Sequence, residues 1–372
     1  MNIKKLNLTL VILSTLLVIT FSSLAYAVLT DNVDNLKTCG AGKAYSEDNP
    51  ACSGVCATNA SGEIIIASNG LPYDADNSAA YRDSCNMVPD FYRVTLYSGG
   101  LCTADPYSAT GTTVDYTTNC DLFFSDAAGK VITLTHEGDG TATATPSLTE
   151  AGINLGIKTY THAYMVMSNH LQIKHSTTFD YSGVASNIAT KMQGGGSSQT
   201  EGLVCWTTDR TSTFANLDGT TGASHGTRTL RVGDGTAAES STQCGDTLGS
   251  THAYATEIIE SFGQAEDNWG DSAVTPRMAY SASPLDIGGT KAAILLQDDL
   301  TTVATTMENG VVMLYAVALT TPLAITEETT TFNIGFGLSG SVSVDFTTKS
   351  GSNELYIAKH GADPVDIKFT AE

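Results

Sequence analysis

Positively charged residues are scarce in this chain. Its 372 residues include 18 Lys and Arg against 39 Asp and Glu, which gives a formal net charge of −21. Binding to phosphate backbones and to anionic membranes depends on clustered Lys and Arg. The composition therefore argues against nucleic acid and against anionic membrane surfaces as partners.

Long hydrophobic runs are missing from the sequence after the N-terminal segment. The longest later apolar run, Val311 to Leu319, has only the length of a strand, whereas a membrane-spanning helix needs roughly 20 residues. The sequence thus predicts no transmembrane helix beyond residue 27.

The first 27 residues have the pattern of a secretory signal peptide. Lys4 and Lys5 precede an uncharged stretch from Leu6 to Ala25, and Ala25-Tyr26-Ala27 is the small-x-small motif of a cleavage site. Cleavage would leave 16 basic and 39 acidic residues, a formal charge of −23. An uncleaved membrane anchor is the alternative. The polar sequence that follows at once favours cleavage, and hence a protein of the periplasm, the cell surface or the medium.

Cysteine usage agrees with export, because an even number of cysteines in an exported chain predicts disulfides. The eight are Cys39, Cys52, Cys56, Cys85, Cys102, Cys120, Cys205 and Cys244. Closeness in sequence favours Cys102–Cys120 and Cys205–Cys244, with the first four pairing among themselves. Cys52 and Cys56 are spaced like half a zinc site, but no second close pair or His-x-x-x-His completes a tetrahedral set.

Strand patterns dominate the mature chain and predict a mainly β, antiparallel, β-sandwich-like fold of one or two β domains. The regions are a cystine-rich irregular cap (28–87), an antiparallel β region (88–183), Gly/Ser/Thr-rich loops (184–275) and a C-terminal β region (276–372). One short helix is predicted over 251–262. There, Ala255, Ile258, Ile259 and Phe262 stand at i, i+3, i+4 and i+7 before Gly263.

Three patterns in the first β region predict particular strands. Alternation over Tyr92–Tyr97 predicts a half-buried strand, and 122–134, with Gly129 in its loop, predicts a hairpin. Residues 160–168 and 171–174 are predicted to form a strand pair that turns near Asn169.

Two patterns in the last region predict further strands. The run Val311–Leu319 is typical of a strand buried on both faces. From Phe332 to Phe346 large apolar residues occupy even positions only, which predicts one long strand or two joined by a bend around Gly340. We expect this segment to offer an edge to a neighbouring subunit.

The motifs that could carry chemistry are weak. Gly222–Gly226 matches the Gly-x-Ser-x-Gly elbow of a hydrolase with Ser224 as nucleophile, but no strand precedes it and no helix follows. Asp74, Asp76 and Asn77 could offer oxygen ligands to calcium, as could Glu266–Asp271, although neither has the spacing of a calcium loop. No catalytic, cofactor-binding or metal residue is therefore predicted, and calcium stays open.

Histidine and tryptophan give two more candidates. His162, His170 and His175 lie close in sequence, as metal ligands do, but they do not share one strand face. Trp206 and Trp269 could be sugar-stacking platforms, or Trp206 could pack beside a cystine. We expect an exported structural or surface protein of the appendage type, acting through β-sheet contacts with itself or other surface proteins, without catalysis. An extracellular binding module for carbohydrate, possibly stabilised by calcium, and a hydrolase using Ser224 are the alternatives.

Overall fold

The computed structural model describes a chain built of strands. The described residues are 28–31, 56–68, 70, 84–136, 142–145, 155–186, 190–194, 201–213, 242–259, 262, 276–282, 289–306, 309–338, 340–348 and 355–372. They form strands β1 to β22 and, within these ranges, no helix. The mainly β fold predicted from the sequence is confirmed.

The largest sheet has ten strands, and the order of eight of them is β13-β15-β8-β4-β7-β18-β17-β16. The other two, β5 and β6, extend from the second edge of β4. Its members are β4 (Phe91–Cys102), β5 (Cys120–His136), β6 (Ala142–Thr145), β7 (Thr159–Ser168), β8 (His170–Lys174), β13 (Thr211–Thr213), β15 (Ala255–Ile258), β16 (Arg277–Ala282), β17 (Gly289–Leu296) and β18 (Val312–Ala324).

Three smaller sheets complete the structure. The three-stranded sheet contains β1 (Val28–Asp31), β19 (Thr331–Gly337) and β22 (Asp366–Ala371). The five-stranded sheet contains β11 (Glu201–Gly202), β10 (Met192–Gly194), β21 (Leu355–Ala362), β20 (Val342–Thr348) and β3 (Ser84–Met87). The four-stranded sheet contains β14 (Thr242–Gly245), β12 (Val204–Thr207), β9 (Ser176–Asp180) and β2 (Ile64–Ile65).

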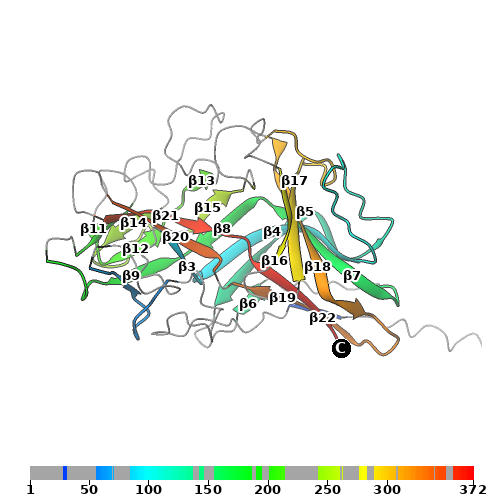
Figure 1. Ribbon diagram of the computed structural model, residues 1–372, viewed down its shortest axis with the longest axis horizontal. Coiled ribbons are helices and arrows are strands. Elements are labelled where there is room, and N and C mark those ends of the chain that lie inside the picture. Colours follow the sequence, from blue (N-terminus) through cyan, green and yellow to red (C-terminus); the bar gives the residue numbers. More distant parts are fainter. Residues whose placement is uncertain are drawn as a thin grey trace, which may run out of the picture.

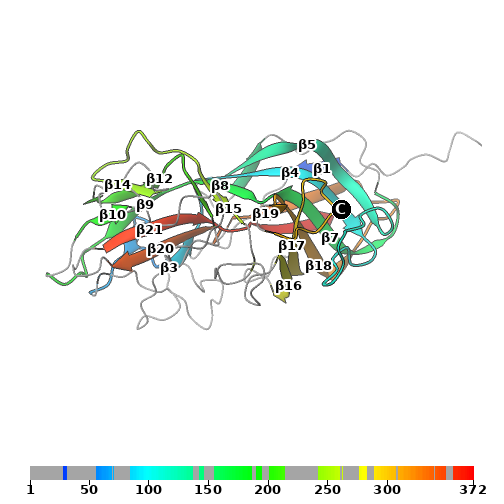
Figure 2. The same ribbon diagram turned by 90° about the horizontal axis from the view of Figure 1, so that it is seen from above.

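The sheets are arranged along one long axis. In both views the five-stranded and four-stranded sheets lie at one end, and β7, β17 and β18 lie toward the other (Figures 1 and 2). The chain crosses from one end to the other in the connections from β3 to β4, from β8 to β9, from β19 to β20 and from β21 to β22. We call the region of these passages the junction.

The main core lies between the ten-stranded sheet and the smaller sheets. The ring of Phe123 on β5 is 5.2 Å from that of Phe332 on β19 and 5.8 Å from that of Phe369 on β22. All three are buried. Because burial of a Phe side chain contributes about 1.5–3 kcal/mol, this contact fastens the sheets in a sandwich-like arrangement.

The centre of the ten-stranded sheet is covered on its opposite face as well. Tyr164 and Leu314 lie in a second buried cluster, where the ring of Tyr116 stacks on that of Tyr164 with centroids 4.7 Å apart. Tyr116 belongs to segment 103–119, whose ends are joined by the Cys102–Cys120 disulfide. Two-sided burial explains the middle of the apolar run 311–319, because β18 is buried at every residue from Val312 to Val317, whereas Val311 is exposed.

The predicted hairpin at 122–134 is wrong, because β5 is one continuous strand. Both of its halves pair with β4: Leu134 lies opposite Tyr92 and Leu122 opposite Gly100. The register jumps where Leu96 pairs with Lys130 and Ser98 with Ser125, so the intervening residues form a bulge. Gly129, with φ of 82°, supplies a left-handed conformation for this bulge instead of a chain reversal.

The predicted pairing of 160–168 with 171–174 is also wrong, although both strands exist. β7 and β8 lie one after the other along the same edge of β4, which pairs with β8 through Phe91–Arg93 and with β7 through Leu96–Cys102. Beyond them the sheet forks, since β7 continues to β18 and β8 to β15. Asn169 stands at this fork.

The predicted helix at 251–262 is replaced, within the described residues, by a turn and then β15. This strand pairs with β8 on one side and β13 on the other. Ala255, Glu257 and Ile258 are buried in it. Two neighbouring strands satisfy the backbone here, so sheet pairing overrides the helical spacing of the apolar residues.

The alternating segment 332–346 forms two strands, β19 and β20, and Gly340 between them has φ of 75°. Contrary to our expectation, neither offers an edge. β19 lies between β1 and β22, and β20 lies between β3 and β21.

Candidate functional site at the junction

Buried polar side chains gather at the junction. Buried polar residues normally cost stability unless their hydrogen bonds are satisfied. A group of them therefore indicates a specific hydrogen-bonding arrangement. The buried polar residues on the elements that meet here are His175, Thr177, Thr207, Thr208, Thr242, Glu257, Ser341 and His360.

His360 on β21 is held by two threonine hydroxyls. Its Nε2 lies 3.0 Å from Thr177 Oγ1 on β9, and its Nδ1 lies 3.2 Å from Thr242 Oγ1 on β14. A hydroxyl can donate or accept, so both ring nitrogens of a neutral imidazole are satisfied. This arrangement leaves neither nitrogen for a metal ion.

His175 follows β8 at the passage to β9 and is bound differently. Its backbone N–H donates to Thr207 Oγ1 at 3.0 Å, whereas neither ring nitrogen has a hydrogen-bond partner in the described structure. The ring meets that of His360 edge-on, with centroids 5.5 Å apart. Its Nδ1 lies 3.8 Å from the Asp90 carboxylate.

Burial sets the charge state of His175, His360 and His252, which we call the histidine cluster. Desolvation lowers the pKa of His175, and it lowers that of His360 to well below the usual value, where His175 and His252 add to the effect. The pKa of His252 is lowered by desolvation and then by Lys174, while Asp90 opposes the shift. The cluster is therefore neutral at neutral pH.

Glu257 ties the ten-stranded sheet to the passage from β21 to β22. Its Oε2 accepts a hydrogen bond from Ala362 N at 2.6 Å. Nearby, the Tyr92 hydroxyl donates to Asp363 O at 3.0 Å. Both side chains belong to the inner face of the ten-stranded sheet, so the junction is locked by side chain to backbone bonds from β4 and β15.

Beside the cluster lies a surface that we call the cationic–aromatic face. It is formed by outward-facing residues of β4, β8 and the start of β15: Phe91, Arg93, Gln172, Lys174, Tyr254 and Thr256. The Arg93 guanidinium lies 3.7 Å above the Tyr254 ring, and Lys174 Nζ lies 5.8 Å from the Phe91 ring. The Phe91 side chain is 37 % exposed. The face thus combines aromatic rings with two positively charged side chains.

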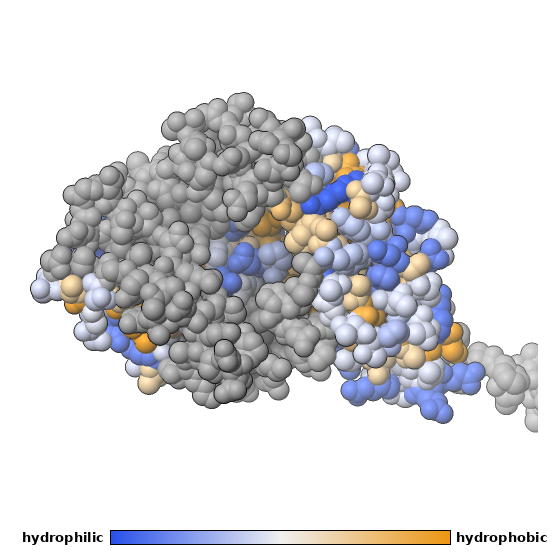
Figure 3. Space-filling view, in the orientation of Figure 1, coloured by the Kyte–Doolittle hydropathy of each residue, from blue (hydrophilic) through white to orange (hydrophobic). Residues whose placement is uncertain are grey.

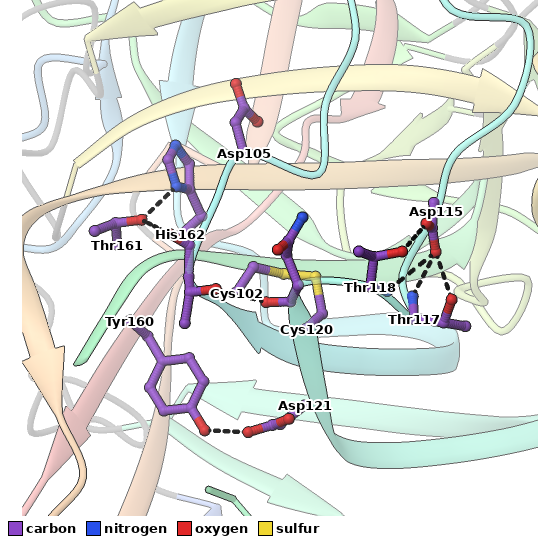
Figure 4. Close-up of a disulfide and its surroundings, with 12 residues drawn as sticks. Cys102, Asp105, Asp115, Thr117, Thr118, Cys120, Asp121, Tyr160, Thr161 and His162 are labelled. Atoms are coloured by element: carbon purple, nitrogen blue, oxygen red, sulfur yellow. Dashed lines mark hydrogen bonds between the residues drawn. A yellow bond between two sulfur atoms is a disulfide. The ribbon is translucent and has the colours of Figure 1, made fainter. Parts of the chain in front are cut away.

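The predicted disulfides are found where the structure describes their cysteines. Cys102–Cys120 and Cys205–Cys244 are confirmed, and Cys56–Cys85 joins two of the first four cysteines. Figure 4 shows Cys102–Cys120 with Asp121 and Tyr160 nearby. Cys39 and Cys52 lie outside the described residues.

The three histidines close in sequence do not converge. His162 on β7 has its Nδ1 2.9 Å from Thr161 Oγ1 (Figure 4), His170 is exposed at the start of β8, and His175 is buried at the junction. Among the described residues no group of three His, Cys, Asp or Glu side chains is arranged to hold a metal ion.

Trp206 is a buried packing residue beside Gly245 and Gly249, and it is not a sugar-stacking platform. It is 6 % exposed, follows Cys205 directly, and its Nε1 donates to Thr251 Oγ1 at 2.9 Å. The other candidates, Ser224, Asp74, Asp76, Asn77, Glu266–Asp271 and Trp269, lie outside the described residues.

Sequence reasoning missed His252, His360 and the cationic–aromatic face. Thr177 and His360 are 183 residues apart, so no spacing rule connects them. The sequence offered one signal for the cluster, which is that His175 lies in a stretch where apolar and polar residues otherwise alternate.

Fold and site together define a mainly β, disulfide-bonded protein with a buried histidine cluster between its sheets. Comparison with protein-family models, curated proteins and solved structures finds no match for this chain. Within the described residues, no helix has the length and apolar character needed to cross a membrane.

Proposed function

We propose that this chain is an exported surface protein that assembles with further copies of itself by strand addition at β16. The observation that carries the proposal is the position of β16, at the end of the ten-stranded sheet. A free edge strand presents N–H and C=O groups that can pair with another chain.

The surroundings of β16 hold this edge in place. Within the described structure β16 pairs with β17 alone. The Arg277 guanidinium donates to the carbonyls of Ser108 and Gly111, and the Tyr280 hydroxyl donates to Asp105 at 2.6 Å. These bonds hold the side chains of β16 against segment 103–119. Strand addition at β16 therefore costs little further conformational entropy.

The chemistry of the chain supports export. Three disulfides are typical of an oxidising compartment outside the cytoplasm. The pattern of residues 1–27 favours a cleaved secretory signal. In the view of Figure 3, hydrophilic residues are mixed with scattered hydrophobic ones over the half that holds β7 and β18. The cell surface, the periplasm and the medium all fit these features. We propose the cell surface, because copies that assemble there stay with the cell.

The test is light scattering during size-exclusion chromatography of the exported, oxidised protein over roughly a hundredfold range of concentration. We expect the mass to grow with concentration. Ala279→Lys places a charge on β16 at an exposed position and should raise the concentration needed for assembly by about tenfold or more, because edge lysines oppose strand addition.

Thr178→Lys is the matched control. Thr178 is also exposed, but β9 is flanked by β12 and β2, so its edges are occupied. This variant should assemble like the unmodified protein. A monomer at every concentration, or equal effects of the two lysines, would contradict the proposal.

A further inference from the structure

The cationic–aromatic face has the composition of a ligand site. Its residues are aligned across three strands, since Phe91 lies opposite Lys174, and Arg93 opposite Gln172. Gln172 in turn lies opposite Thr256 and donates to its Oγ1 at 2.9 Å. The rings of Phe91 and Tyr254 meet edge-on with centroids 6.5 Å apart.

The two cations of this face have unused capacity. Neither Arg93 nor Lys174 forms an ion pair with a described residue. The nearby carboxylate of Asp90 accepts hydrogen bonds from the N–H and hydroxyl of Ser176 at 3.0 and 3.3 Å. The Nε–H of Arg93 is buried without a hydrogen-bond partner in the described structure. The Lys174 ammonium and the other N–H groups of the Arg93 guanidinium can therefore donate to an anionic ligand.

The position of the face excludes strand addition. β4 is flanked by β5 and β8, and β8 by β4 and β15. A bound molecule therefore lies on the flat face and contacts side chains. Aromatic rings beside fixed hydrogen-bond donors suit the apolar faces and hydroxyls of a sugar, and the two cations add a preference for negative charge.

We propose that the cationic–aromatic face binds an acidic saccharide, with Phe91 against a sugar ring and Arg93 and Lys174 on its anionic group. A net charge of −21 repels polyanions at long range, so the ligand is a short segment whose charge is met locally. The shared chemistry is an anionic sugar, whether the charge is a carboxylate or a sulfate. This site is independent of assembly at β16.

The experiment is calorimetric titration of the exported, oxidised protein with three oligosaccharides. They are an oligogalacturonate, a sulfated galactan fragment and a neutral galactan fragment, each at low and moderate salt. We expect one or both acidic sugars to bind at least about tenfold more tightly than the neutral one, and binding to weaken with salt. Whichever acidic sugar binds more tightly identifies the anionic group.

Variants locate the site. Lys174→Gln and Phe91→Ala should each weaken binding by about tenfold, whereas Lys130→Gln on β5 removes the same charge elsewhere and should leave affinity unchanged. Each variant is first shown to melt as a folded protein, and Phe91→Ala alters a partly exposed side chain.

Three results with these sugars and variants would overturn the proposal. They are no binding of either acidic sugar, equal affinity for the neutral fragment, or equal loss in Lys130→Gln and Lys174→Gln. Tighter binding of a polyglutamate peptide than of either acidic sugar would also overturn it, in favour of an acidic polypeptide.

Discussion

At the scale of single residues, the junction depends on neutral histidines. Burial lowers the pKa of both His175 and His360, so the unfolded chain binds more protons than the folded one at mildly acidic pH. The stability contributed by their neutral forms is complete above the unfolded pKa of about 6.5. It is lost as the pH falls below that value.

We therefore expect the free energy of unfolding to decrease between about pH 6.5 and 5.5, by at most about 1.4 kcal/mol per pH unit for each buried histidine. Urea unfolding at closely spaced pH values measures this slope. His360→Gln should reduce it, because a neutral amide can bond to Thr177 and Thr242 without titrating.

The control for this prediction is His162→Gln, which removes a histidine on β7, away from the cluster. It should keep the slope of the unmodified protein. If His360→Gln keeps the full slope as well, the acid sensitivity comes from other groups and the cluster plays no part in it.

At the scale of elements, Asn169 decides how the ten-stranded sheet divides. Its side-chain Nδ2 donates to Ile259 O at 2.9 Å and to Gly310 O at 2.8 Å, and its backbone carbonyl accepts from Ile259 N at 2.9 Å. The side chain is fully buried. It thereby joins the end of β15 to the start of β18 at the point where β7 gives way to β8.

Asn169→Ala would leave two buried carbonyls without donors, each costing about 1–3 kcal/mol. We expect it to lower the free energy of unfolding in urea by about 2–4 kcal/mol. Asn119→Ala is the matched control, since its side chain is exposed and its loss should change stability by less than about 0.5 kcal/mol. Equal effects would show that the fork is maintained by strand pairing alone.

At the scale of the whole molecule, the charge imbalance opposes compactness. The net charge is −21, and the described Lys–acid ion pairs, Lys158–Asp121 and Lys191–Asp246, are at least partly exposed. Exposed pairs contribute little to stability. Repulsion among carboxylates is consequently the larger electrostatic effect on the folded chain.

Added salt should therefore stabilise this protein. Raising NaCl from about 10 mM to about 150 mM shortens the screening length from roughly 30 Å to 8 Å, and we expect Tm to rise. A fall in Tm would mean that ion pairs outweigh repulsion. A further rise in Tm with CaCl2 at matched ionic strength would indicate that the protein binds calcium, which the acidic segments of the sequence neither predict nor exclude.

The sequence by itself determined the class of this protein. Alternating and continuous apolar patterns predicted the strands at Tyr92–Tyr97 and Val311–Leu319, because the period of apolar residues follows from which backbone faces are buried. Closeness in sequence predicted Cys102–Cys120 and Cys205–Cys244, because short loops close easily. These properties are local, so a single sequence carries them.

Only the tertiary structure decided which strands are neighbours. A run of residues reports that it is half-buried, but not against what, and the partner depends on segments far away in the chain. For this reason β5 pairs along β4 without reversing, and the helical spacing at Ala255–Phe262 yields to pairing with β8 and β13. The junction follows the same rule: His175 and His360 meet because β9, β14 and β21 come together there, and burial in that packing is what keeps them neutral.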